Sequence, residues 1–246
     1  MYKSLKQKVI ISMIALMGLF TIVALFVVNY SLSNALISNA QEDLKAIINE
    51  HAEEIETILY EGHKVLHSIN KHPVLRAYYE TGFNTDYDNQ VLTELKSFNL
   101  DGNYSAIYIM DINGNTLLST EPSFLEQNYS FRDYFQRAIM GEDVVDVLVG
   151  VTSNKLGYYF ASPIVVDEKI EGVIVAKMYP GIVHDKINNI KQKADVKILF
   201  IDKYGVVLYS NMAERTFKTL GEAPIHNIEV ISKEKRFGTM KIPALS

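Results

Sequence analysis

The pattern of apolar and polar positions begins with a long apolar run. Residues 9–28 carry no charged side chain, and a helix of about 20 apolar residues spans the hydrocarbon core of a bilayer. A cleaved signal peptide is the alternative, but its apolar region is shorter and a small-x-small cleavage site should follow directly, which this run lacks. We therefore expect a transmembrane helix at residues 9–28.

The charges that flank this run predict its orientation. Lys3, Lys6 and Lys8 precede it, whereas polar and then acidic residues follow it. Because lysine and arginine are enriched on the cytoplasmic side of a membrane span, residues 1–8 are expected in the cytoplasm. The rest of the chain is then expected outside.

A second helical pattern follows at residues 31–70, which contain no proline. Its apolar positions alternate in steps of three and four, with interruptions at His51 and Gly62. They are Leu44, Ile48, Ile55, Ile58, Val65 and Ile69. A helix of this length extends about 60 Å, so part of its stripe could pair with a second copy in a parallel homodimer. The same spacing is also typical of a helix that packs on its own domain.

Beyond Pro73 the pattern shortens and then changes period. Residues 74–81 and 88–98 are expected to form short helices. Alternating apolar positions then predict strands, and Asn113-Gly114 suits the tight turn of a hairpin between the first two. The expected strands are 104–110, 115–120, 144–152, 158–166 and 170–178, with a helix at 130–140.

The hairpin pattern occurs twice. Residues 108–119 and 199–210 share an apolar run, an Asp-x-x-Gly turn and a second apolar run. Three more strands follow the first hairpin, and too few residues follow the second to hold the same set. We therefore expect two related units, the second incomplete, in the front portion of a longer protein or in a truncated gene product.

Composition excludes several classes of protein. Of the 246 residues, 48% are hydrophobic, enough to build a core. The 24 basic and 29 acidic residues are interspersed, so no nucleic-acid-binding face is indicated. The chain has no cysteine, which excludes disulfides, thiolate nucleophiles and zinc–thiolate sites.

Three stretches carry a resemblance to a known family. They read SFRDYF at residues 130–135, GYYFASPI at 157–164 and GVIVAKM at 172–178. Together with the long helix and the paired hairpins, they resemble the double Cache (tandem PAS-like, or PDC) sensor domains of bacterial receptors. The resemblance covers residues 31–246.

The resemblance implies an α+β fold and a membrane location. A transmembrane and stalk helix would precede two PAS-like units with central antiparallel sheets, a membrane-distal ligand-binding unit at 71–180 and a truncated membrane-proximal unit at 181–246. Such domains belong to histidine kinases, diguanylate cyclases and chemoreceptors of the bacterial inner membrane, with the sensor periplasmic or extracellular. A second membrane span is then expected beyond the C-terminus.

Two cationic residues indicate the class of ligand. The resemblance places Lys177 where amine-binding and amino-acid-binding relatives carry an aspartate. Arg132 has a planar guanidinium that can hold a carboxylate through two parallel hydrogen bonds. Two cations around one cavity favour a small mono- or dicarboxylate, as in the dicarboxylate-, pyruvate- and acetate-sensing members of the family.

Four hydroxyl groups could orient such a ligand: those of Tyr129, Tyr134, Tyr159 and Ser162. Strand alternation puts Tyr159 and Ser162 on opposite faces, so at most one of these two can point into the pocket.

The candidate cations also have ordinary explanations. Arg132 could pair with Asp133 or Glu126 on the surface. Lys177, within an apolar run, must be paired, reach solvent at the strand end, or line a polar cavity.

Neither a metal nor a cofactor is expected. His63 and His67 share a helix face, but no HExxH motif or third ligand accompanies them, which favours a solvated face. The Asp111 turn resembles a calcium loop only superficially, because its glycine comes two positions early and Pro122 takes the place of the closing carboxylate.

The sequence thus predicts the ligand-sensing region of a membrane signal-transduction receptor rather than an enzyme, because no nucleophile with a base, paired carboxylates or metal cluster stands out. A missing output domain could be a kinase or a diguanylate cyclase.

The alternative function is that of an interaction module that docks a periplasmic binding protein and has no small ligand of its own. In the sensor hypothesis, ligand bridging Arg132 and Lys177 favours a closed distal unit and shifts the long helix against its dimer partner.

Overall fold

The computed structural model describes residues 5–193 and 196–244. Lys3, one of the three lysines used above to predict orientation, lies outside the described residues. The chain divides into two compact units, Met1–Ala52 and Glu53–Ser246. The boundary falls inside the first helix, α1 (Leu5–Lys71).

The first unit consists of the N-terminal part of α1. Its apolar side chains are exposed, and among the described residues α1 contains the one stretch that is long and apolar enough to cross a membrane, by length and composition. The Thr21 hydroxyl in this stretch donates to the carbonyls of Met17 (2.7 Å) and Gly18 (3.0 Å). The helix itself therefore satisfies this polar group, as an apolar surrounding requires.

The rest of α1, from Glu53 onward, belongs to the second unit and packs on its sheet. The interruption of the apolar stripe at Gly62 has a physical reason, because a Cβ there would collide with the ring of Phe160 on the sheet. The short helices α2 (Pro73–Glu80) and α3 (Asp88–Ser97) follow, linked by the 3-10 turn η1 (Thr85–Tyr87), and both confirm the predicted helices.

A five-stranded antiparallel sheet forms the centre of this unit, in the order β2-β1-β5-β4-β3. Its strands are β1 (Tyr104–Asp111), β2 (Thr116–Ser119), β3 (Val144–Val149), β4 (Leu156–Val166) and β5 (Lys169–Met178). The turn between β1 and β2 forms as predicted: Gly114 has a φ of +83°, and the Asp111 carboxylate accepts from the backbone N–H groups of Asn113 and Asn115.

The two faces of the sheet carry different layers. One face packs against α1, α2 and α3 and includes Ile107, Phe160 and Ile174. The other face carries the short helix α4 (Asp133–Ala138) and the 3-10 turn η2 (Pro122–Phe124). The prediction of a helix over 130–140 was too long, because Arg132 has extended backbone angles at the N-terminus of α4.

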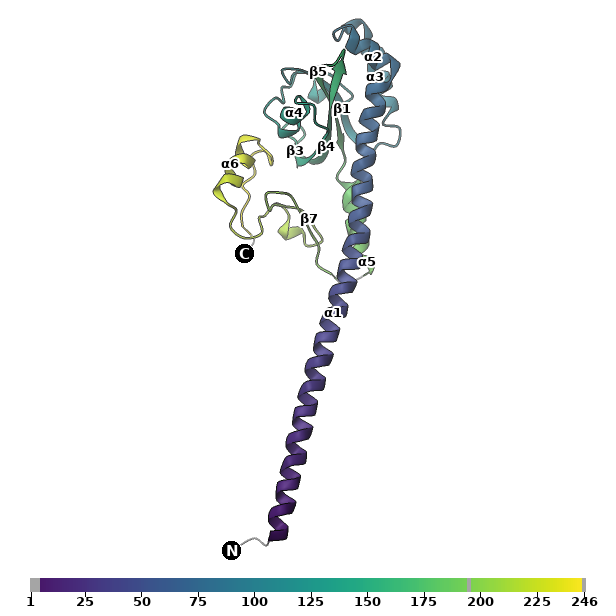
Figure 1. Ribbon diagram of the computed structural model, residues 1–246. Helices are drawn as coiled ribbons and strands as arrows, with labels where there is room; N and C mark the ends of the chain where they lie inside the picture. Colours follow the sequence, from purple (N-terminus) through teal and green to yellow (C-terminus); the bar gives the residue numbers. More distant parts are fainter. Residues whose placement is uncertain (1–4, 194–195, 245–246) are drawn as a thin grey trace. The chain divides into compact units, whose positions relative to one another are not determined.

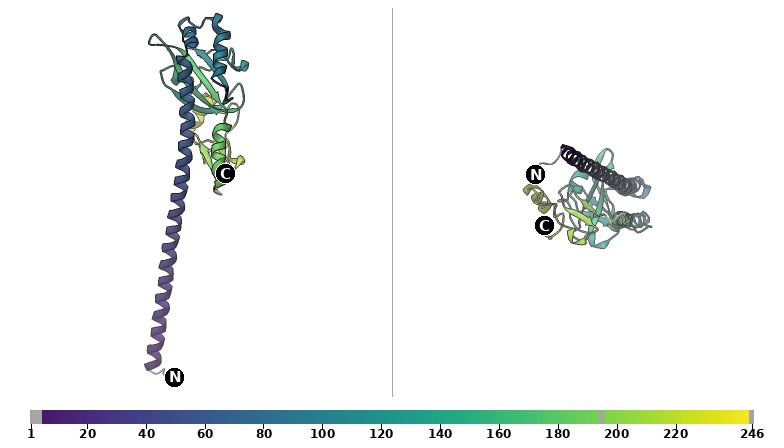
Figure 2. Two further views of the ribbon diagram at one scale, coloured as in Figure 1. Left: turned by 90° about the vertical axis from the view of Figure 1, so that its right-hand side faces the viewer. Right: turned by 90° about the horizontal axis from the view of Figure 1, so that it is seen from below.

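The remaining residues build a smaller sheet. The helix α5 (Gly181–Lys193) lies beside α1 in both Figure 1 and Figure 2. Next come β6 (Leu199–Ile201), β7 (Val207–Ser210), the 3-10 turn η3 (Ala213–Arg215) and α6 (Ile225–Lys233).

The turn between β6 and β7 repeats the geometry of the first hairpin. Gly205 has a φ of +82°, and Asp202 accepts from the N–H groups of Tyr204 and Val206. The repeated sequence pattern therefore corresponds to a repeated structure. The division at residue 180 stays a prediction.

Candidate functional site

Lys177 is the centre of the candidate site. It lies on β5 opposite Tyr159 of β4, and only 2% of its surface is exposed. Its ammonium group donates to the hydroxyl of Ser153 and lies 5.7 Å from the ring centre of Phe124 and 5.3 Å from that of Tyr159. Among the described residues no carboxylate forms an ion pair with it.

The surroundings of Lys177 disfavour its positive charge. Burial, together with the nearby positive charges of Lys155 and Arg132, lowers its pKa to about 8. A buried ammonium without a carboxylate partner is costly. The site is therefore complementary to an anion.

Arg132 is also buried, with 1% of its surface exposed. Its guanidinium donates to the backbone carbonyls of Val149 (3.1 Å), Glu234 (2.9 Å) and Lys235 (3.0 Å). The alternative in which it pairs with Asp133 or Glu126 on the surface is wrong, because the side chain points into the protein. The structure thus brings Arg132 close enough to Lys177 to affect its pKa, while three of its five N–H groups bind carbonyls.

Three of the four predicted hydroxyl groups, those of Tyr129, Tyr134 and Tyr159, lie on the face of the sheet that carries α4. Tyr134 stacks on Tyr159 with ring centres 5.3 Å apart and shares a hydrogen bond with Tyr108 (2.9 Å). Tyr129 shares one with Thr152 (2.6 Å). The buried Tyr159 hydroxyl has no hydrogen-bond partner among the described residues, and burial raises its pKa well above 10.0. These neutral hydroxyls are potential donors to an anion.

The loop after β3 closes over these groups. The strand predicted at 144–152 is shorter in the structure, because β3 ends at Val149. The chain then turns back, and the backbone N–H of Gly150 donates to the carbonyl of Lys155 (3.0 Å). This turn brings the hydroxyl of Thr152 to that of Tyr129 and the hydroxyl of Ser153 to the ammonium of Lys177. Sequence reasoning missed both residues; the polar run Thr-Ser-Asn-Lys after the apolar strand was the available signal.

A cleft of about 900 Å³ reaches this site. Lys177, Phe124 and Ser153 line the cleft, and Lys155 and Glu121 also contribute. The Glu121 carboxylate accepts from the hydroxyl and the backbone N–H of Ser123. The cleft could admit a small organic molecule to Lys177.

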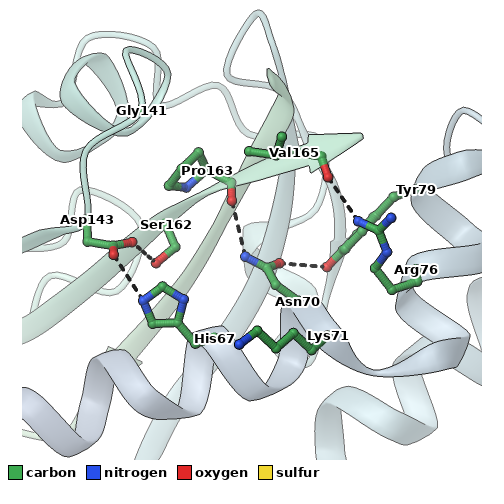
Figure 3. A pocket seen from close by; sticks show the side chains of 10 residues that line it. All are labelled: His67, Asn70, Lys71, Arg76, Tyr79, Gly141, Asp143, Ser162, Pro163 and Val165. Atoms are coloured by element: carbon green, nitrogen blue, oxygen red, sulfur yellow. Dashed lines mark hydrogen bonds and ion pairs between the residues drawn. The ribbon is translucent and has the colours of Figure 1, made fainter. Parts of the chain in front are cut away.

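Ser162 lies elsewhere, on the face that packs against α1, as strand alternation requires. Its hydroxyl donates to Asp143 (2.6 Å), whose other carboxylate oxygen is 3.0 Å from Nε2 of His67. These residues line a second cavity of about 420 Å³, shown in Figure 3. The structure therefore separates Ser162 from the other five predicted residues.

The polar groups of this second cavity bind one another. Asn70 donates to the carbonyl of Pro163 (3.1 Å), and Arg76 donates to that of Val165 (3.0 Å), as Figure 3 shows. These bonds fasten α1 and α2 to β4. His67 binds Asp143, and the described residues contain no group of three potential metal ligands.

Taken together, the PAS-like sheet and the cation-lined cleft define a ligand-sensing domain. The model of the Cache domain family (dCache_1) matches residues 32–241, and the chain belongs to this family.

Named relatives support the same class. The C4-dicarboxylate transport sensor protein DctB of Pseudomonas aeruginosa is 33% identical over 115 residues, which cover 45% of this chain. The match spans only 18% of that relative's length.

Among solved structures, the sensor domain of the V. cholerae histidine kinase DctB has a TM-score of 0.73 at 23% identity, covering 83% of this chain and 80% of that one. The sensory domain of the Campylobacter jejuni chemoreceptor Tlp3 with isoleucine bound has a TM-score of 0.58 at 15% identity, covering 74% of each chain. At these identities the likeness shows the fold alone.

Proposed function

We propose that this chain is the extracytoplasmic sensing region of a membrane receptor and binds a small carboxylate at Lys177. The observation that carries the proposal is a buried lysine that lines a cleft and has no carboxylate partner among the described residues. A ligand carboxylate would replace the Ser153 hydroxyl as the partner of the ammonium. It would relieve the desolvation penalty with a charge-assisted hydrogen bond.

The charges around the cleft support an anion over an amine. Arg132 and Lys155 both lie near enough to lower the pKa of Lys177. Glu121 also lines the cleft, but Ser123 holds its carboxylate. An ammonium ligand would therefore meet more positive than negative charge.

Two separate cations favour a dicarboxylate, with one carboxylate on Lys177 and the other on Arg132. The name of the P. aeruginosa relative, a C4-dicarboxylate sensor, agrees with this choice. We take succinate as the test ligand.

Membrane attachment follows from the apolar part of α1, whose length and composition fit a span. We propose that this helix anchors the domain with its N-terminus in the cytoplasm. The exposed apolar positions of the stalk, such as Leu44 and Ile48, would then pair in a homodimer.

Calorimetric titration of the full chain in detergent with succinate and acetate tests the proposal. Lys177→Met keeps the side-chain length without the charge and should weaken succinate binding about tenfold or more, the contribution of one charged hydrogen bond. Lys169→Met, at the exposed end of the same strand, should bind like the unchanged protein. Equal binding by Lys177→Met would refute the site, and a folded chain that binds neither acid would favour the protein-docking alternative.

A further inference from the structure

A segment from the far end of the chain covers the edge of the five-stranded sheet. The strand β3 is an edge strand, and residues 234–237, here named the docking segment, lie against it just after α6. The backbone N–H of Val149 donates to the carbonyl of Arg236 (2.7 Å). Figure 1 shows α6 close to β3.

Buried groups hold the docking segment in place. The Arg236 guanidinium, 1% exposed, forms a bidentate ion pair with Asp146 of β3 and donates to the carbonyl of Val147 (3.1 Å). Phe237 packs with Val149 of β3 and with Leu208 of β7. Removing one partner of such a pair would leave an uncompensated buried charge. A change in either partner of this pair should therefore weaken the contact more than a change in a surface ion pair would.

Arg132 connects the docking segment with Lys177, which lines the cleft: it binds carbonyls of the segment, and its charge lowers the pKa of Lys177. Two of the three carbonyls that it binds, those of Glu234 and Lys235, lie directly after the last residue of α6, where Glu234 is the C-cap. The last carbonyls of a helix lack intrahelical partners and carry partial negative charge. The end of α6 thus gives Arg132 a pair of acceptors.

We propose that a ligand carboxylate and the C-terminal end of α6 compete for Arg132, so that ligand binding releases the docking segment from β3. This inference rests on the proposed function. A carboxylate carries a full negative charge and can take two parallel N–H bonds from a guanidinium, whereas a peptide carbonyl offers only a partial charge, so the ligand is the better acceptor. Because Phe237 packs on β7, release of the segment changes the contacts of the smaller sheet and carries the signal there.

The coupling between ligand binding and the contact of the docking segment with β3 is negative if the two compete for Arg132, and positive if Arg132 holds both at once. If Arg132 held the ligand with its two remaining N–H groups while it kept the carbonyls, ligand and docking segment would stabilise each other. If the two compete, a change that weakens the contact of the docking segment with β3 should make the ligand bind more tightly, because coupling between two sites is reciprocal.

Asp146→Asn in the full chain tests the sign, because it removes the charge of β3 that pairs with Arg236 and leaves Arg236, among the described residues, only Glu234 of its own segment as a charged partner. Competition predicts that this variant binds succinate at least about fivefold more tightly than the unchanged protein. Glu142→Gln, which breaks the exposed pair with Arg137, is the control and should leave the affinity unchanged. Unchanged or weaker binding by Asp146→Asn would overturn the proposal.

A measurement on the unchanged protein covers the case in which Asp146→Asn does not fold. Hydrogen exchange of the Val149 amide, which the docking segment protects, should speed up when succinate is added. Succinate binding with unchanged or slower exchange overturns the competition alone. No succinate binding overturns the proposed function and the competition with it.

Discussion

Raising the pH should stabilise the ligand-free protein through Lys177. Its pKa is about 8 in the folded protein, against an ordinary value of 10.5. Below pH 8 the side chain is charged in both the folded and the unfolded state, and burying it costs about 3 kcal/mol, the equivalent of the pKa difference. As the pH rises from about 8 to 10.5, the folded protein loses the proton first, so the free energy of unfolding increases.

The expected gain between pH 7 and pH 9.5 is about 2 kcal/mol. Lys177→Met never carries the charge, so it should be more stable than the unchanged protein by about 3 kcal/mol at pH 7 and by only about 1 kcal/mol at pH 9.5. The buried tyrosines, whose pKa values burial raises, are present in both proteins. Their effect on the difference therefore cancels.

Calorimetric unfolding of both full-length proteins across this pH range, in detergent and without ligand, measures the difference. Lys169→Met, which removes an exposed lysine from the same strand, should follow the unchanged protein at every pH. A stability difference between Lys177→Met and the unchanged protein that stays constant from pH 7 to pH 9.5 would show that burial does not lower the Lys177 pKa.

Two further predictions concern the rest of the unit. Ser162→Ala should lower the free energy of unfolding by about 1 kcal/mol, because Asp143 loses one hydrogen bond but is exposed enough to bind water instead. It should leave succinate affinity unchanged in calorimetric titration; weaker binding would place Ser162 in the ligand site. Gly114→Ala and Gly205→Ala should each cost about 1 kcal/mol, because both glycines have positive φ. Gly114→Ala should cost more in denaturant unfolding, since its Cβ would lie 2.6 Å from the backbone of Ser130, whereas Gly205 has open space; equal losses would contradict this reasoning.

Much of the fold could be predicted because its signals are local. The two Asp-x-x-Gly turns form as expected, since glycine tolerates the positive φ and the aspartate binds the turn's own N–H groups. Alternation correctly put Tyr159 and Ser162 on opposite faces. The ends of elements were less predictable: the helix over 130–140 was too long, and β3 ends at Val149 instead of Thr152. Element ends depend on contacts with the rest of the protein.

The site was only partly predictable. Lys177 stood out because a charge within an apolar strand needs an explanation, and the structure shows it buried beside the cleft. Its partner Ser153 did not stand out, because a serine after a strand is an ordinary loop residue. Two of the three carbonyls that bind Arg132 lie about a hundred residues further along the chain. Because every residue has a backbone carbonyl, a sequence pattern cannot show which ones become partners.

The sequence by itself determined the apolar helix, the order and type of most elements, the repeated hairpin, and the presence of one lysine, Lys177, within an apolar strand. These features depend on side-chain periodicity and local backbone preference, which neighbouring residues carry. Only the tertiary structure decided which groups meet: Lys177 with Ser153, Arg132 with the end of α6, and Arg236 with Asp146. Such pairs form between distant segments, because buried charges and hydrogen-bond donors must find partners wherever folding brings the chain together.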